Sequence, residues 1–239
     1  MIYLCILFIS PFFLCILQFL IQLSRISLTL YYYQFKIFYN MNNFDFGNGD
    51  NVFLTSDTHY YHESILNLCN RPYSSVEEMN EALITNWNNK VGKNDIVFHL
   101  GDFCFGSSTK WNKILERLNG HIYLILGNHD SVNLKDNSKQ YFEYITYQMS
   151  IHIDGWKLYL NHYPFLCFGG AWSPERLVTQ AFGHVHSGSN CHGLDYIRLI
   201  NLFPSQYDVG VDNNNYEPIS WKEFKNIVEK RMFEGEGKQ

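Results

Sequence analysis

Short apolar runs along the chain stop abruptly at polar or glycine-containing segments. Three of them have the length and the Val, Ile and Phe content of buried strands: Asn51–Ser56, Asp95–Leu100 and His121–Leu126. Residues that favour loops follow each run, so each run predicts a strand that ends at a turn. These strands alternate with segments of helical period, which is typical of a sheet with helices outside it.

Capping signals predict the helices between these strands. Ser75 is followed three positions later by Glu78, the pattern of a capping box, and we expect the helix it opens to run to about Asn88. Residues 110–118 have helical periodicity and are closed by Asn119-Gly120, a common way for a helix to end.

The later part of the chain has a different pattern. Asp154-Gly155 separates the apolar segments 150–153 and 156–160, and this dipeptide is a strong signal for a tight hairpin. A second capping box, Ser220 with Glu223, predicts a last helix to about Met232. The strands of this part are therefore expected to form hairpins and a meander.

These elements predict one domain over residues 41–239, because no repeat and no linker divides them. The expected fold class is α/β of a mixed, α+β-like type. Its architecture is a two-sheet β-sandwich flanked by helices, rather than one doubly wound sheet.

The first forty residues differ in composition from the rest. They hold 11 of the 41 aromatic residues and only two charges, Arg25 and Lys36. Residues 1–24 are uncharged and long enough to cross a bilayer as a helix. Three interpretations remain open: an untranslated stretch before a true start at Met41, a membrane anchor through residues 1–23, and a signal peptide that lacks a basic start. The first predicts a cytoplasmic protein and the second a membrane-anchored one.

Charge excludes some classes of protein. The whole chain carries a net charge of -5, and residues 41–239 carry 16 basic and 23 acidic side chains, a net of -7. Their basic residues never occur three in a row, so no duplex nucleic acid is expected as a partner. The six cysteines include no C-x-x-C pair, which excludes a zinc knuckle or a thioredoxin-like motif and predicts reduced thiols.

The polar residues that could bind a ligand or take part in catalysis lie just past the predicted strands. The segments are Asp57-Thr58-His59, Gly101-Asp102, Gly127-Asn128-His129-Asp130, Asn161-His162 and Gly183-His184-Val185-His186. Side chains at the carboxyl ends of neighbouring strands converge on the crevice where α/β sheets bind ligands. Aspartate and histidine together suit divalent ions such as Mn, Fe and Zn, and the glycines let the backbone bring them close.

The order of these segments resembles the calcineurin-like metallophosphoesterase superfamily, whose pattern is D-x-H, G-D, G-N-H-[DE], a lone His and G-H-x-H. The resemblance covers roughly Asn51 to Asp212 and is greatest to small, compact bacterial and phage members, with which the chain shares Cys69–Tyr73, Asn86–Asn88 and His99–Phe103. It implies a four-layer arrangement of helices and sheets.

The resemblance also implies a centre of two divalent ions (Mn, Fe, Zn or Ni, with Mn favoured). Asp57, His59 and His186 would hold the first ion, Asn128, His162 and His184 the second, and Asp102 would bridge them. The two ions would activate the attacking water. His129 would contact the phosphoryl oxygen or protonate the leaving group, with Asn128 also near the substrate.

Several neighbouring residues keep two interpretations each. Asp130 could orient the ring of His129 or cap the following helix, and Arg71 could clamp a phosphate or form a structural salt bridge. His62 could line the pocket or lie in a surface loop. The aromatic segment Tyr163–Trp172 is expected to pack over the site. His99, His121, His152 and His192 are interpreted as structural, and Asp208 and Asp212 are given no ligand role.

The expected function is therefore a metal-dependent hydrolase of phosphate monoesters or diesters. A small phosphodiester or nucleotide-like substrate is favoured, since only 34 positions separate Asn128 from His162 and leave no room for an inserted cap domain. The alternatives are a degenerate member that binds a nucleotide or partner without turnover, a protein phosphatase, and a membrane-bound enzyme for a lipid phosphate. The oligomeric state is left open.

Overall fold

The computed structural model describes two stretches of the chain, residues 44–188 and 196–235. The predictions for residues 1–40, including the membrane anchor through residues 1–23, lie outside the described residues. Within the described stretches, no helix has both the length and the apolar character needed to cross a bilayer. Contacts along the chain set Asp45–Gln239 apart as one compact unit, and the description below concerns that unit and the strand at its start.

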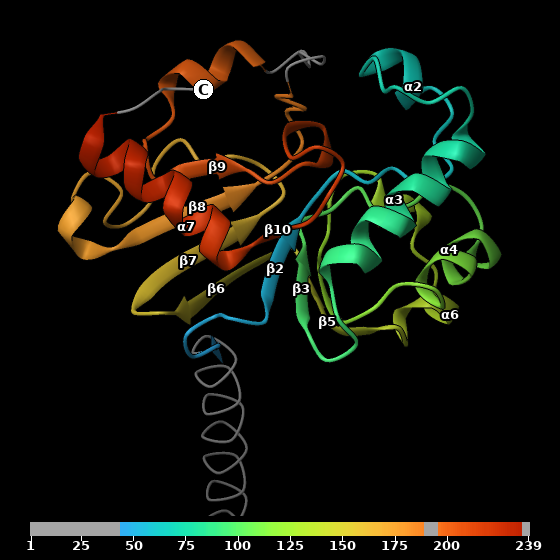
Figure 1. The fold of residues 1–239 in the computed structure, drawn as a ribbon, viewed down its shortest axis with the longest axis horizontal. Helices are drawn as coiled ribbons and strands as arrows, with labels where there is room; N and C mark the ends of the chain where they lie inside the picture. Colours follow the sequence, from blue (N-terminus) through green and yellow to red (C-terminus); the bar gives the residue numbers. More distant parts are fainter. Residues whose placement is uncertain (1–43, 189–195, 236–239) are drawn as a thin grey trace, which may run out of the picture. The chain divides into compact units, whose positions relative to one another are not determined.

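Two five-stranded sheets form the centre of the described fold (Figure 1). The first has the order β10-β2-β3-β4-β5 and consists of β2 (Val52–Thr55), β3 (Ile96–His99), β4 (His121–Ile125), β5 (Phe142–Thr146) and β10 (Ile219–Ser220). The second has the order β1-β6-β7-β8-β9 and consists of β1 (Phe44–Asp45), β6 (Gln148–Ile153), β7 (Trp156–Asn161), β8 (Val178–Phe182) and β9 (Gln206–Asp208).

The first sheet brings together the three strands that the apolar runs predict. β2 pairs with β3, and β3 with β4, in parallel, so that Leu54 lies beside Phe98 and Phe98 beside Tyr123. Val97 belongs to a core on one face of the sheet, while the alternate residues Leu54 and Phe98 are fully buried on the other. Because the three strands are parallel, their carboxyl ends meet at one edge of the sheet.

The described residues form six helices, two of which begin at the predicted capping signals. They are α2 (Ile65–Leu68), α3 (Val76–Lys90), α4 (Ser108–Leu115), α5 (Asp130–Asn133), α6 (Asp136–Lys139) and α7 (Trp221–Glu229). Short 3₁₀ turns lie at Pro174–Arg176, Tyr196–Asn201 and Val211–Asn213, and a π turn follows α7 at Lys230–Glu234. The side chain of Ser75 accepts a hydrogen bond from the Glu78 N–H, and Ser220 with Glu223 forms a complete capping box.

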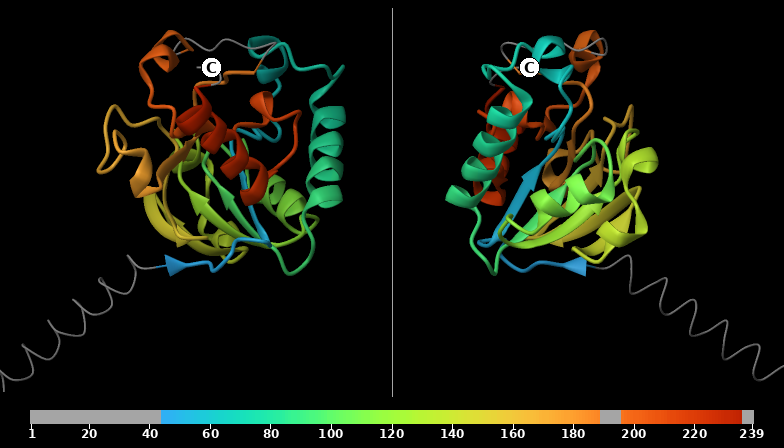
Figure 2. Two further views of the ribbon diagram at one scale, coloured as in Figure 1. Left: turned by 60° about the vertical axis from the view of Figure 1, so that its left-hand side comes forward. Right: turned by 90° about the vertical axis from the view of Figure 1, so that its right-hand side faces the viewer.

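Helices α3 and α4 cover the outer face of the first sheet (Figure 2). Trp87 of α3 and Trp111 of α4 are almost fully buried there, in the same core as Val97 of β3. Each indole removes a large apolar area from water, so this layer stabilises the frame from which the loops after β2, β3 and β4 emerge.

In the second sheet the predicted hairpin is present, whereas the prediction of a meander is wrong. Asp154 and Gly155 both have positive φ, 50° and 76°, between the antiparallel strands β6 and β7. Strands β7, β8 and β9, however, pair in parallel. A meander needs tight turns, whereas the chain between β7 and β8 is long and includes the turn Pro174–Arg176, which lets it cross back before β8 begins.

Helix α7 packs where the two sheets approach each other. It contacts β10 and β2 of the first sheet and β9 of the second. The ring of Trp221 lies 6.4 Å from that of Trp156 on β7, and the ring of Phe224 lies 5.9 Å from that of Tyr207 on β9. The predicted fold class, two sheets flanked by helices, is therefore confirmed.

Candidate metal centre

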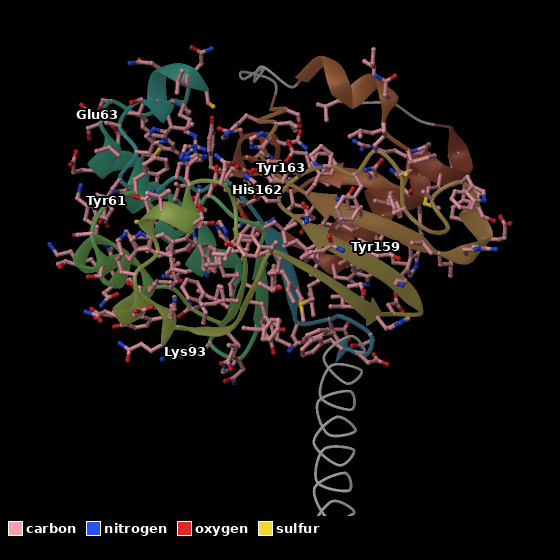
Figure 3. All side chains as sticks on the ribbon, turned by 180° about the vertical axis from the view of Figure 1, so that it is seen from behind. Tyr61, Glu63, Lys93, Tyr159, His162 and Tyr163 are labelled. Atoms are coloured by element: carbon pink, nitrogen blue, oxygen red, sulfur yellow. The ribbon has the colours of Figure 1, made fainter. Side chains whose placement is uncertain are left out.

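All seven predicted metal ligands lie in loops that leave the carboxyl ends of strands. Asp57 and His59 follow β2, Asp102 follows β3, Asn128 follows β4, His162 follows β7, and His184 and His186 follow β8. In Figure 3 the labelled His162 and its neighbour Tyr163 lie toward the opposite end of the strands from Lys93, which precedes β3. Loops from both sheets thus supply the site.

The ligands separate into two clusters that we name here. In the first cluster, Asp57, His59 and His186, one ligand atom of each residue lies within 4.8 Å of the others. The same holds for the second cluster, Asp102, His162 and His184.

Asp102 stands between the two clusters. Its Oδ2 lies 3.7 Å from His59 Nε2 and 3.5 Å from His162 Nε2. Asn128 joins the second cluster, with Oδ1 3.1 Å from His162 Nε2. The structure therefore brings together every predicted ligand, in the grouping that the family resemblance implies.

Two buried atoms of the first cluster are placed to bind a common ligand. Asp57 Oδ1 and His59 Nε2 are buried, 3.7 Å apart, and neither has a hydrogen-bond partner within the described part of the chain. Leaving such groups unsatisfied is costly, and native proteins rarely do so without a bound ion or water. Carboxylate oxygen and imidazole nitrogen also form the donor set that borderline divalent ions prefer, so the residues present fit a metal.

The backbone of the site is strained at the ligands themselves. Positive φ angles, which side chains other than glycine rarely adopt, occur at Asp57 (57°), His59 (51°), Asp102 (54°), His184 (70°) and His186 (48°). Such angles persist only where the surrounding structure enforces them, and they concentrate at functional sites. The fold therefore positions these five side chains through their backbone as well as through packing.

Glycines allow the loops after β3 and β4 to meet. A Cβ on Gly101 would lie 2.5 Å from the Gly127 nitrogen and 2.7 Å from His162 Nδ1, closer than real contacts allow. Gly101 also has φ 99°. The expectation that glycines beside the ligands permit close approach is confirmed at this position.

Asp130 holds these two loops together and does not orient His129 as expected. Its buried carboxylate accepts hydrogen bonds from the N–H groups of Gly127 (2.9 Å), Asp102 (2.7 Å) and Phe103 (2.9 Å). Burial raises the pKa of this carboxyl to about 6, although the N–H donors oppose the shift. The interpretation that Asp130 caps the following helix is also not what the structure shows, because all three donors precede that helix.

His129 faces the centre without belonging to either cluster. Its backbone N–H donates to Asp102 Oδ1 at 2.9 Å, and its Nε2 lies 3.8 Å from Asp102 Oδ2. The side chain is 42% exposed, and its ring packs 4.7 Å from that of Phe105. An imidazole that is accessible and aimed at the shared carboxylate is placed to meet a substrate there.

His62 and Phe105 extend the first cluster outward. The His62 ring stacks on Phe105 at 3.8 Å, and its Nδ1 lies 3.1 Å from Nδ1 of His59. Of the two interpretations of His62, the structure thus favours a place beside the site. Phe105 carried no sequence signal beyond following the G-D segment, and its role is a packing contact that only the fold reveals.

A buried ion pair lies behind the first cluster. Arg71 Nε and Nη2 each lie 2.9 Å from a carboxylate oxygen of Asp212, and Asp212 Oδ2 lies 2.7 Å from Nδ1 of His186. Arg71 also donates to the carbonyl oxygens of Asp57 (2.7 Å) and Thr58 (2.9 Å). A phosphate clamp needs an exposed guanidinium, whereas this side chain is fully buried, so the salt-bridge interpretation of Arg71 is the one the structure shows.

Asp212 therefore takes part in the site although sequence reasoning gave it no role. It fixes the tautomer and orientation of His186 in the way that carboxylates behind metal-binding histidines do. Burial opposes its ionisation, but the charge of Arg71 and the bond to His186 lower its pKa to about 2. Its position 26 residues after His186 offered no recognisable signal.

The imidazoles carry different charges when no ion is bound. Burial opposes protonation of His162, yet its hydrogen bond to Asp102 and the nearby carboxylates raise its pKa to about 9. Burial likewise opposes protonation of His186, and Asp212 and Asp57 raise its pKa to about 9. For His59 burial dominates and lowers the pKa to about 4. At neutral pH, a cation that binds His162 or His186 would therefore displace a proton.

The aromatic segment Tyr163–Trp172 meets the site only at its first residue. The Tyr163 ring lies 5.0 Å from that of His162 and 4.7 Å from that of His184. Phe168 instead packs on Tyr159 of β7 at 5.5 Å. The loop is therefore packed at Phe168 as expected, but this packing is against β7.

The remaining predictions concern residues outside the centre. His99 is buried and bonds the Thr58 hydroxyl at 3.0 Å, and His121 pairs with Glu143 on the surface, so both are structural as expected. Two of the described cysteines, Cys104 and Cys167, are free thiols. His192 lies outside the described residues.

Comparison with known proteins places this geometry in a family. Residues 51–230 match the family model described as calcineurin-like phosphoesterase. An uncharacterised protein of Methanocaldococcus jannaschii, MJ1445, is 36% identical over 183 residues, which cover 75% of this chain and 92% of that protein. Gene 66 protein of Mycobacterium phage L5 is 37% identical over 83 residues, 34% of this chain and 40% of its own. The solved structure of AQ665 from Aquifex aeolicus, a protein of unknown function, has a TM-score of 0.56 at 27% identity and covers 74% of this chain and 98% of its own.

Proposed function

The chain belongs to the calcineurin-like phosphoesterase family, and from that premise we propose that it hydrolyses small phosphate esters with the help of two divalent ions. The observation that carries the proposal is the pair of ligand clusters that face each other across Asp102. No predicted ligand position is replaced, so nothing in the chain favours a degenerate, purely binding member.

Each cluster offers the donors for one ion. The first cluster would hold one ion, and the second cluster with Asn128 would hold the other, with Asp102 shared between them. When bound, two such ions supply Lewis-acid stabilisation of the phosphoryl oxygens and lower the pKa of the attacking water. The donor set of carboxylate, amide and imidazole supports manganese as the favoured ion, with iron, zinc and nickel as alternatives.

The chain's own residues position the substrate and move the proton. Asn128 and His129 stand at the open side of the centre, where a phosphoryl oxygen would lie. His129 would donate the proton that the leaving oxygen needs, and its exposed ring and its 3.8 Å approach to Asp102 support this role. Asp130 and Asp212 would act through the loops and the imidazole that they hold.

The composition supports a small substrate rather than duplex nucleic acid. Residues 41–239 carry a net charge of -7, and Arg71, a candidate phosphate clamp in the sequence, is buried in an ion pair. Duplex binding depends on several accessible Lys or Arg contacts with phosphates. A small diester or nucleotide-like phosphate therefore remains the proposed substrate.

Hydrolysis of chromogenic esters by the purified full chain tests the proposal. We expect turnover of p-nitrophenyl phosphate or its bis-ester only after manganese is added, and its loss on chelation. A phosphopeptide and linear DNA, assayed under the same condition, test the protein phosphatase and nuclease alternatives. Turnover that survives complete removal of divalent ions would contradict the proposed chemistry.

A further inference from the structure

A cavity opens beside the second cluster, and the chemistry described so far gives it no role. Its volume of about 440 Å³ is in the range of pockets that bind small molecules. The residues that matter for its character are Tyr163, Phe165, Leu166, His184, Asn201 and Leu202. They come from the loops after β7 and β8 and from the 3₁₀ turn before β9.

The cavity is continuous with the metal centre. His184 belongs to both, and the Tyr163 ring packs 4.7 Å from the His184 ring. The Tyr163 hydroxyl lies 3.4 Å from Asn128 Oδ1. A group that enters the cavity therefore lies next to the place where Asn128 and the second cluster would hold a phosphoryl group.

The lining selects an uncharged and flat occupant. Apart from His184, the described side chains on it are apolar, aromatic or neutral, and no Lys, Arg, Asp or Glu is among these described residues. A charged group would lose its hydration there without gaining a partner. Aromatic rings, by contrast, gain burial and favourable edge or face contacts with Tyr163 and Phe165. The amide of Asn201 adds one hydrogen-bonding group at the wall.

The placement of His129 indicates which end of a substrate lies in the cavity. Its ring lies 5.7 Å from that of His59 and 4.7 Å from that of Phe105, on the side of the first cluster. The leaving oxygen that His129 would protonate belongs on that side. The cavity beside His184 is therefore suited to the ester group that stays on the phosphorus.

We propose that this cavity binds an uncharged aromatic group on the retained side of a phosphodiester, supplied either by a simple aryl ester or by a nucleobase-bearing one. The inference rests on the proposed function, because the terms retained group and leaving group assume that the site hydrolyses a phosphate ester. Binding to the cavity can nevertheless be measured without turnover.

The test compares two ligands that share one head group. Phenylphosphonate and methylphosphonate cannot be hydrolysed at their P–C bond, and we expect the full chain with manganese to bind phenylphosphonate at least about tenfold more tightly in calorimetric titration. The methylene phosphonate analogues of adenosine 5′-phosphate and ribose 5-phosphate, in which CH₂ replaces the ester oxygen and blocks hydrolysis, form the second pair and separate a nucleobase from a simple aryl group. Equal affinities within both pairs would overturn the proposal.

Two variants test whether the preference for phenylphosphonate over methylphosphonate comes from the cavity. Leu166→Asp places a carboxylate at the cavity, and Leu68→Asp is a matched control on α2, because both leucines are largely exposed (84% and 68%) and neither substitution should unfold the protein. We expect Leu166→Asp to lower the ratio of the phenyl to the methyl affinity at least about threefold, and Leu68→Asp to leave the ratio as it is. An unchanged ratio in Leu166→Asp would assign the preference elsewhere and overturn the proposal.

Turnover separates this inference from the proposed function. The p-nitrophenyl esters of the same two phosphonates share a leaving group and differ only in the retained group. A phenyl preference in kcat/KM that matches the binding ratio supports both proposals. Selective binding of phenylphosphonate with no hydrolysis of either ester would sustain the cavity and reject the phosphoesterase.

Discussion

The two ligand clusters differ in what lies behind their imidazoles. In the first cluster, Nδ1 of His186 meets the Asp212 carboxylate, which is itself paired with the buried Arg71. In the second, Nδ1 of His162 lies 2.8 Å from the Leu100 carbonyl oxygen, and the outer neighbour is the exposed ring of Tyr163. His186 is thus held by buried charges, and His162 by a backbone carbonyl oxygen.

This difference indicates a division of labour between the clusters. Buried charges that are fully paired hold a ligand in one orientation and are costly to disturb, so we expect the first cluster to bind its ion more tightly. The second cluster adjoins the open cavity. The same pair of ions would therefore be held by one rigid and one accessible half.

Asp102→Asn should have the largest effect, because it acts on the carboxylate that both clusters share. An amide replaces a charged oxygen that lies within 3.7 Å of imidazoles on both sides. We expect both ions to be lost or weakened, and the rate to fall by more than the roughly 10–100-fold typical of residues behind the ligands. Metal analysis with steady-state kinetics measures it. Full metal content and an unchanged rate would falsify the assignment of Asp102.

His129→Gln should separate chemistry from metal binding. The side chain faces the centre outside both clusters, so we expect two ions to remain bound while kcat falls by about 10²–10⁴-fold, the range for a positioned acid or base. If the ions are lost instead, His129 is a ligand and the partition of roles is wrong.

Asp212→Asn should reduce the difference between the clusters by weakening metal binding at the first one. It removes the charge behind His186, so we expect one of two manganese sites to weaken by roughly 10–100-fold. Tyr163→Phe is the comparison in the second cluster, and its loss should be less than about fivefold, because a 3.4 Å contact is a weak hydrogen bond. Calorimetric titration resolves the two sites. Equal weakening of both sites by Asp212→Asn would indicate general destabilisation, and a thermal melt run in parallel would identify it.

The pH dependence should sharpen the same contrast. His162 and His186 have folded-state pKa values raised to about 9, so at lower pH an ion must displace a proton from each. We expect manganese affinity to fall as pH falls from 9 to 6.5, by up to about tenfold per unit for each proton displaced. In Asp212→Asn only the site served by His186 should lose part of this dependence.

The metal-free protein should respond to pH in the opposite direction. A folded pKa of about 9 against 6.5 in the unfolded chain means that protonated His162 and His186 stabilise the fold fully below pH 6.5. That contribution is lost as pH rises through 9. Thermal melts of the chelated protein at pH 6.5 and 9.5 should show a lower Tm at the higher pH, and added manganese should remove the difference.

The polar segments of the site were predictable from the sequence because each lies directly after a strand whose apolar run is easy to recognise, whereas their roles as ligands were implied by the family resemblance. Parallel pairing of β2, β3 and β4 then brings Asp57, Asp102 and Asn128 to one edge without further information. The hairpin and the capped helices were predictable for a similar reason, since their signals span only a few positions.

The supporting residues were not predictable, because their partners are set by tertiary contacts between distant segments. Asp130 follows a histidine in the motif, yet its carboxylate turns toward the N–H groups of the loop after β3. Arg71 and Asp212 are far apart in the sequence, and neither carries a local pattern. The parallel order of β7, β8 and β9 depends on long connections whose course no turn signal indicates.

The Arg71–Asp212 pair also has a consequence for when the site is completed during synthesis. The two residues are separated by 141 positions, and the guanidinium joins the first ligand loop to a residue near the end of the domain. On a ribosome, β2, β3 and β4 emerge well before Asp212, so their ligands precede the anion that anchors Arg71 and His186. A nascent chain would therefore acquire its tighter ion only as the last strands dock, which ties metal capture to the closing step of folding.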